Sequence, residues 1–196
     1  MAKAFKRKGD RFVAHLDDVE REVVVSLLEQ THDFLAPAYR EPTGNTFDDL
    51  VATLGVRQPV DPRVGDPEAP LDPALERLLP TAHRDDPAMA AEFRRLTEHG
   101  LRERKTANLS VAIAALQAAD GDKVRLDHAQ AQATVVALTD VRLLLGERLG
   151  LRTDQDADDL QDRLEAASED DPELFIAAYY DFMTWFQESL TQALMA

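Results

Sequence analysis

The sequence contains no cysteine among its 196 residues. This absence excludes disulfides, thiolate metal sites, iron–sulfur clusters, cysteine nucleophiles and thiol redox switches. Long hydrophobic runs are also missing, because no segment approaches the roughly 20 apolar residues of a membrane-spanning helix. The basic N-terminus is not followed by the apolar stretch of a signal peptide. We therefore expect a cytoplasmic protein with no membrane segment.

Positive charge is scarce. The 22 Lys and Arg residues are outnumbered by 37 Asp and Glu residues, which gives a formal net charge of −15. Direct nucleic-acid binding is not expected of such a chain, because phosphate contacts need clustered Lys and Arg. The exception is residues 1–11, which carry a net charge of +4. We interpret these cations as protection of an edge strand against pairing with other sheets, and a local nucleic-acid contact is the weaker alternative.

Common catalytic motifs are absent as well. The sequence has no glycine-rich phosphate loop, no paired-histidine zinc helix and no nucleophile elbow. We therefore predict no catalytic residue, no cofactor and no metal site. The nearest approach to a metal motif is Asp154–Glu165, whose acids follow EF-hand spacing although Asp159 stands where glycine is needed. The same acids suit the first turns of a helix, which is the interpretation we favour.

Apolar residues at helical spacing and residues that cap helices predict a mainly α fold. We expect one domain over residues 1–196, a bundle of about six to seven helices with a short N-terminal β-hairpin over residues 3–16. Residues 56–73 hold half of the ten prolines and predict an exposed loop. Helix starts are expected at or just after these residues: Asp17, Thr46, Asp72, Asp86, Asp127, Thr153 and Asp171.

The helices differ in their expected burial. The helix after Asp127 is apolar on most sides, which predicts a place near the centre of the bundle. The long helix after Asp86 is expected to bury one face, and the residues of that face are Met89, Phe93, Leu96, Leu109, Ile113 and Leu116. Residues 153–173 carry ten acids and one arginine, which indicates a solvated acidic face or a docking surface for a basic partner.

Arg142 shares a helical face with leucines and should be partly buried. Because a buried charge needs a partner, we predict that Arg142 pairs with Glu92 or Asp140 and holds two central helices in register. An anion-binding or catalytic arginine is the alternative, which is weakened because no nucleophile or base accompanies it.

The final helix, expected over residues 172–196, holds six of the twelve aromatic residues. One aromatic stripe would be enough to dock this helix on the core. Two adjacent apolar stripes indicate a second contact, because aromatic residues are favoured at interface hot spots. We therefore predict that the helix closes the core and also contributes to a homodimer or partner interface. The predicted interface residues are Phe175, Tyr179, Phe182, Trp185 and Phe186.

Several segments, in order, resemble one known family. They are Leu78-Leu79-Pro80 with Asp85-Asp86-Pro87, Glu92-Phe93-Arg94-Arg95-Leu96-Thr97, Leu138-Thr139-Asp140-Val141-Arg142-Leu143 with Gly146-Glu147-Arg148-Leu149-Gly150, and Gln187-Glu188-Ser189-Leu190. Over nearly the whole chain the sequence resembles a family of high-GC Gram-positive bacteria long described as a domain of unknown function and now associated with AosR, an oxidative stress regulator.

The resemblance implies a non-enzymatic regulator that contacts an alternative sigma factor. In that family the contact is tied to a closely spaced cysteine pair, which this chain lacks, so a disulfide switch is not transferred. Gene neighbourhood in the family suggests an alternative, an accessory factor for Clp-type proteolysis. A second alternative from a different class is a small metal-dependent hydrolase, with a site built around Arg94, Arg95, Arg142 and a carboxylate.

Overall fold

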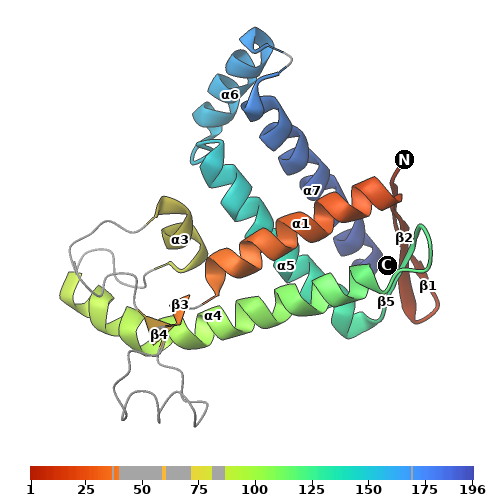
Figure 1. Ribbon diagram of the computed structural model, residues 1–196, viewed down its shortest axis with the longest axis horizontal. Coiled ribbons are helices and arrows are strands. Elements are labelled where there is room, and N and C mark those ends of the chain that lie inside the picture. Colours follow the sequence, from red (N-terminus) through yellow and green to blue (C-terminus); the bar gives the residue numbers. More distant parts are fainter. Residues whose placement is uncertain (37, 40–58, 61–71, 81–86, 169) are drawn as a thin grey trace.

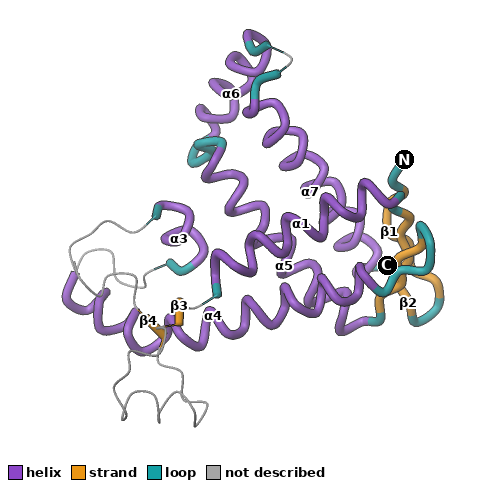
Figure 2. Tube along the Cα trace, in the orientation of Figure 1, coloured by secondary structure: helices purple, strands orange, loops and turns teal. Residues whose placement is uncertain are grey.

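The computed structural model describes residues 1–36, 38–39, 59–60, 72–80, 87–168 and 170–196, and within the first turns of the long helix it describes only some of the side chains. The described part contains six helices and two small antiparallel sheets (Figure 2). The helices are α1 (Asp18–Leu35), α3 (Pro73–Leu78), α4 (Pro87–Gln117), α5 (His128–Arg148), α6 (Asp154–Ala166) and α7 (Pro172–Met195). The strands are β1 (Lys3–Lys8), β2 (Arg11–His15), β3 (Ala38–Tyr39), β4 (Pro59–Val60) and β5 (Lys123–Leu126).

The predicted mainly α fold with an N-terminal hairpin is confirmed. Helices α1 and α4 lie side by side in opposite directions, and α5 packs against both of them (Figure 1). Helix α5 also contacts α3 and α7, so its predicted central place is confirmed. Helix α6 and the adjoining ends of α5 and α7 project from this body as an arm, while both chain termini lie near strands β1, β2 and β5 (Figure 1).

Side chains just before the helices fix where they begin. Asp17 and Asp127 each accept the backbone N–H three residues later, and the side chains of Glu20 and Gln130 bond back to the cap residue. Such a reciprocal pair satisfies two N–H groups that the helix itself leaves free. Asp72, Thr153 and Asp171 cap α3, α6 and α7 in the same general way. The predicted starts of these five helices are therefore confirmed.

The larger sheet has the strand order β1-β2-β5 and is antiparallel throughout. Strand β5 was not predicted, because its four residues lie between a turn and a helix cap. So short a segment shows too little alternation of polar and apolar residues to indicate a strand. The inner face of the sheet rests on the helices: the ring centroids of Phe5 and Phe186 lie 4.9 Å apart, and Phe5 N–H donates to Ser189 Oγ at 3.2 Å. This contact joins the first strand to the last helix.

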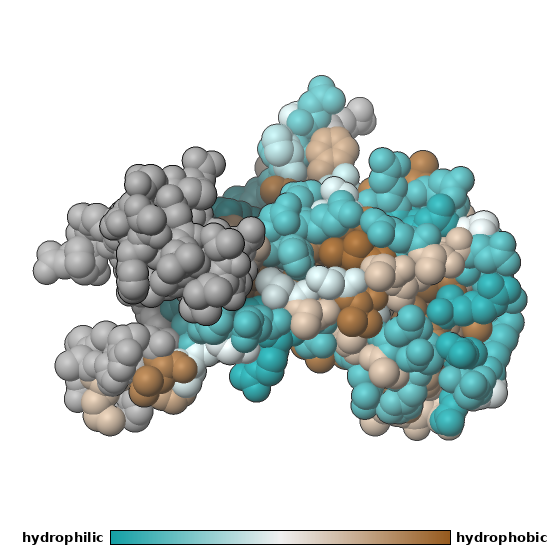
Figure 3. Space-filling model, turned by 60° about the horizontal axis from the view of Figure 1, so that its bottom comes forward, coloured by the Kyte–Doolittle hydropathy of each residue, from teal (hydrophilic) through white to brown (hydrophobic). Residues whose placement is uncertain are grey.

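One core cluster connects the sheet with α1, α3, α4, α5 and α7. A second, smaller cluster at the arm consists of Leu149, Leu160 and Ala177 with the side chains around them. Apolar side chains reach the surface between hydrophilic ones on the face shown in Figure 3. Among the helices described, none is long and apolar enough to cross a membrane.

The predicted buried face of α4 is correct only in part. Leu109 and Leu116 are fully buried, but Met89 and Leu96 are 53% and 65% exposed and Phe93 is also exposed. The first turns of α4 extend beyond the end of α1 (Figure 1), so α1 cannot cover them. The helix expected to begin at Thr46, and the loop expected over 56–73 except for residues 59–60 and 72–73, lie outside the described residues.

Candidate binding face and the polar junctions behind it

The five aromatic residues predicted as an interface lie along one side of α7, but their surroundings differ. Phe186 is fully buried against the sheet and belongs to the core, so its assignment to an exposed interface is corrected. Phe175 and Trp185 are 54% and 38% exposed, and Tyr179 and Phe182 are half-buried. We call these four residues, Phe175, Tyr179, Phe182 and Trp185, the aromatic face.

The aromatic face is anchored by ring contacts. The Phe182 ring stacks on Trp185 with centroids 5.7 Å apart, and on Phe186 with centroids 6.0 Å apart. Since Phe186 in turn contacts Phe5 of β1, the exposed indole is connected to the core by successive rings. A side chain held in this way loses little conformational entropy when it binds, because its ring is already positioned.

Acidic side chains border Trp185 on α7. Asp181 and Glu188 stand four residues before and three residues after Trp185, and both are exposed. Residues at these separations are neighbours on a helix surface. A molecule that covers Trp185 therefore meets an aromatic ring with negative charge on both sides along the helix.

Arg142 of α5 joins α7 rather than α4. Its Nη1 donates to Gln187 Oε1 at 2.7 Å, and its guanidinium carbon lies 5.5 Å from the centroid of the Tyr180 ring. The Gln187 amide donates in turn to the Val135 carbonyl at 3.0 Å and to Thr139 Oγ1 at 2.6 Å. We call this group the α5–α7 junction. The Nε atom of Arg142 is buried and makes no hydrogen bond with the part of the chain that is described.

Asp140 has a different partner. Its carboxylate, 1% exposed, forms an ion pair with Lys105 of α4, and burial raises the pKa of this carboxyl group above its usual range while the Lys105 ammonium opposes the rise. The expected pair between Arg142 and Asp140 is corrected, because residues two apart on a helix point in different directions. The other expected partner, Glu92, has a side chain outside the described residues.

Sequence reasoning missed Lys105 and Gln187, although both leave a signal. Lys105 interrupts an apolar stripe between Leu101 and Leu109, each four residues away. Gln187 likewise lies between Met183 and Leu190 on the buried side of α7. A polar residue within an apolar helical stripe indicates a buried polar contact, and here the two residues supply the links from α5 to α4 and to α7.

The acids with EF-hand spacing lie in helix α6, not in a calcium-binding loop. Asp156 Oδ2 accepts the N–H groups of Arg152 and Thr153 at 2.9 and 2.6 Å, and these hydrogen bonds lower the pKa of the Asp156 carboxyl group. Arg163 holds the arm together by an ion pair with Glu173 at 2.9 Å and a hydrogen bond to the Leu149 carbonyl. Among the described residues, no three His, Asp or Glu side chains are placed to hold a metal ion together.

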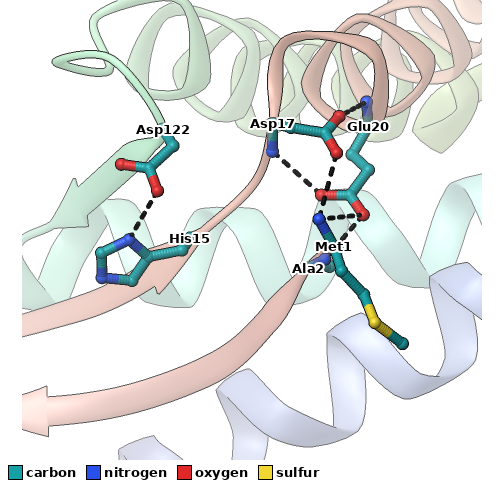
Figure 4. A network of polar contacts seen from close by, with 6 residues as sticks. All are labelled: Met1, Ala2, His15, Asp17, Glu20 and Asp122. Carbon is teal, nitrogen blue, oxygen red and sulfur yellow. Dashed lines mark hydrogen bonds and ion pairs between the residues drawn. The ribbon is translucent and has the colours of Figure 1, made fainter.

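A separate polar network lies where the chain enters α1 (Figure 4). Glu20 Oε1 accepts the N–H of Ala2 at 2.6 Å, and the Met1 amine lies 3.2 Å from Asp17 Oδ2. Hydrogen bonds from the Glu20 backbone and from this amine lower the pKa of the Asp17 carboxyl group. These contacts hold the N-terminal segment against the first turn of α1.

Comparison with known proteins identifies a family without identifying an activity. No curated protein and no solved structure is detectably similar to the chain. Residues 2–194 match DUF2017, a family described as a domain of unknown function. Since this match covers nearly the whole sequence, the chain belongs to the DUF2017 family.

Proposed function

We propose that this protein is a non-enzymatic regulatory protein that acts by binding another protein through the aromatic face of α7. The observation that carries the proposal is the exposure of Trp185, 38% of whose surface is accessible although its ring stacks on Phe182. Large aromatic side chains that are exposed and held in place are typical of interface hot spots.

The side chains around Trp185 indicate what kind of surface the partner has. A surface that fits Trp185, Asp181 and Glu188 together has an apolar pocket bordered by Lys or Arg. Electrostatic attraction to such a border would accelerate encounter and decrease as salt is added, whereas burial of the indole would determine how long the complex lasts.

The resemblance to the AosR-type regulators supports a partner in the transcription machinery, an alternative sigma factor. Because this chain contains no cysteine, the complex forms without a thiol switch in this protein. When the partner is absent, we propose that a second copy covers the aromatic face in a homodimer, which limits the exposure of Phe175 and Trp185 to water.

Affinity purification of the full chain from its native cell, followed by mass spectrometry, tests the proposal. The Trp185→Ala variant should recover the sigma factor at about one tenth of the wild-type level or less. Met195→Ala is the matched control, because Met195 is an exposed apolar residue of the same helix outside the aromatic face. Failure to recover a sigma factor, or equal recovery with Trp185→Ala, would contradict the proposal.

The mass of the purified protein in solution tests the dimer separately. The wild-type chain and Met195→Ala should be dimers, and Trp185→Ala should be a monomer with an unchanged circular dichroism spectrum. A monomeric wild-type protein at high concentration would remove the homodimer and leave the sigma-factor contact to be judged by the capture experiment.

A further inference from the structure

The outer face of the sheet β1-β2-β5 collects positive charge in a chain whose net charge is −15. The strand register pairs Lys6 with Val13 and Val13 with Arg125, so these three side chains form a row across the sheet. A second row is Lys8 with Arg11, and a third is Lys3, His15 and Lys123. We call the basic residues of these rows the basic face.

The basic face points away from the core. Phe12 and Ala14 of β2, which flank Val13 in sequence and therefore point to the opposite side of the strand, are fully buried or nearly so. The side chains of Lys6, Lys8, Arg11 and Arg125 are exposed. Val13 is buried although it lies on this face, where the strand register places Lys6 on one side of it and Arg125 on the other.

Acids around the sheet neutralise only part of this charge. Arg11 lies 3.9 Å from Asp127, Arg125 lies 3.6 Å from Asp120, and His15 lies 3.1 Å from Asp122. Lys3 lies close enough to Asp122 to help lower the pKa of that carboxyl group, after the larger effect of the hydrogen bond from His15. In the part of the chain that the structure describes, Lys6 and Lys8 form no ion pair. These two lysines of the hairpin are therefore available to an external anion.

The spacing of the rows indicates the shape of that anion. Side chains on one face of a strand repeat every second residue, about 6.6 to 6.8 Å, and neighbouring strands lie about 4.8 Å apart. An extended peptide with an acid at every second residue repeats its carboxylates at the same distance. We propose that the basic face binds an extended segment of another protein in which acidic residues alternate with other residues.

Nucleic acid fits this surface less well. Single-stranded binding sites stack bases on aromatic side chains, but the aromatic residues of the sheet, Phe5 and Phe12, point inward and are buried. A long polyanion would also extend past the three rows onto the acids at the start of α1, Asp17 and Asp18, and be repelled by them. A segment of a few residues stays within the rows.

Fluorescence titration of the full chain with labelled peptides tests the proposal. The probes are an alternating peptide of four Glu-Ser repeats and a block peptide of the same composition, four Glu followed by four Ser. At about 25 mM salt the alternating peptide should bind several times more tightly than the block peptide, and about 300 mM salt should abolish most of the binding.

Charge reversal locates the binding surface. Lys6→Glu combined with Arg125→Glu should weaken binding of the alternating peptide by about tenfold or more. Arg7→Glu is the matched control, because Arg7 stands next to Lys6 but is paired with the buried Phe12 and so lies on the opposite face of the sheet. This control should change the affinity by less than about threefold, and circular dichroism should show that all variants fold.

Four results would overturn the proposal. The first is a lack of peptide binding at low salt. The second is equal binding of the two peptides, and the third is an effect of Arg7→Glu as large as that of the double reversal. The fourth is tighter binding of oligothymidylate than of the alternating peptide, which would identify the basic face as a nucleic-acid surface. Each of these results is independent of Trp185 and of the proposed sigma-factor contact.

Discussion

Lys105 on α4 and Asp140 on α5 form an ion pair in which the Lys105 side chain is 16% exposed and the Asp140 side chain only 1%. Burial of a charged pair costs desolvation energy, and mutual attraction offsets that cost only when both partners are present. We infer that the pair adds little net free energy to folding and mainly sets the alignment of α4 and α5. Loss of one member leaves the other charge buried without a partner, which strongly destabilises the fold.

Removal of one member should be far more harmful than removal of both. We expect Lys105→Met and Asp140→Leu each to lower the free energy of unfolding by about 3–5 kcal/mol, and the double variant to lie closer to wild type than either. Urea denaturation measures these values. Arg104→Met, at the exposed neighbouring position of α4, is the control and should change stability by no more than about 0.5 kcal/mol. Single-variant losses below about 1 kcal/mol would show that the pair is not buried.

The Lys105→Met variant should also respond to pH. Because burial raises the pKa of Asp140 above its unfolded value, the folded state favours the protonated carboxyl group. The folded state therefore loses stability as the pH rises through the pKa of Asp140 in the folded protein, because the buried carboxyl group becomes ionised. The stability gap between wild type and Lys105→Met should be smaller at about pH 4 than at about pH 7, as measured by urea denaturation. An equal gap at both values would contradict this role for Asp140.

The α5–α7 junction depends on Gln187. Gln187→Ala removes hydrogen bonds to Arg142, Thr139 and the Val135 carbonyl. It leaves the partly buried Arg142 guanidinium without its acceptor, whereas Thr139 and the Val135 carbonyl remain bonded to each other. We expect a loss of about 2–3 kcal/mol in thermal or urea unfolding. Gln192→Ala, an exposed glutamine on the same helix, should be nearly neutral. Equal stabilities of the two variants would assign Gln187 no part in joining the helices.

The cap of α6 should make the arm sensitive to acid. Backbone N–H groups stabilise the ionised Asp156, so the pKa of its carboxyl group is lowered on folding. The stability that Asp156 contributes is therefore present above the pKa of the unfolded state and is lost as the pH falls through the pKa of the folded state. Helicity of α6 should decrease below about pH 4 in the wild-type chain and less steeply in Asp156→Asn. Hydrogen exchange of the α6 amides at several pH values measures this difference, and Asp158→Asn, which changes an exposed acid of the same helix, is the control. Identical profiles for Asp156→Asn and wild type would refute the assignment.

Two glycines should respond in opposite ways to the same substitution. Gly150, which ends α5, has a φ angle of +74°, where a side chain is strained, so Gly150→Ala should cost about 1 kcal/mol. Gly100 lies inside α4 in open space, so Gly100→Ala should stabilise the protein by about 0.5–1 kcal/mol. Thermal unfolding of both variants measures the two signs, and a loss at position 100 would contradict an exposed helical site there.

The helix starts could be predicted because their cause is local. The carboxylate of Asp17 and the backbone N–H that it accepts are three residues apart, and the same holds for Asp127. The partners of Lys105 and Arg142 could not be predicted in this way. They lie 35 and 45 residues away on other helices, and which side chains meet depends on how those helices cross.

The sequence predicts which residues form the apolar faces of α7 and α4, but not how exposed each of these residues is. The aromatic stripe of α7 was evident from its spacing. Phe186 is nevertheless buried because it packs on Phe5 of β1, whereas Phe175 near the start of α7 is exposed. The same limit applies to α4, where Met89 and Leu109 follow one pattern but Leu109 is fully buried and Met89 is 53% exposed. Periodicity identifies a face, and the length of the neighbouring element decides how much of that face is covered.

The contact between Phe5 and Phe186 has a consequence for synthesis of the chain. The two rings are 181 positions apart in sequence, and Ser189, which accepts the Phe5 N–H, is 184 positions from Phe5. During translation the N-terminal hairpin is therefore made long before the helix that covers its apolar side. Until α7 leaves the ribosome, the apolar side of the hairpin lacks that cover, and the charge of the hairpin's lysines and arginines disfavours pairing with other nascent strands in this interval.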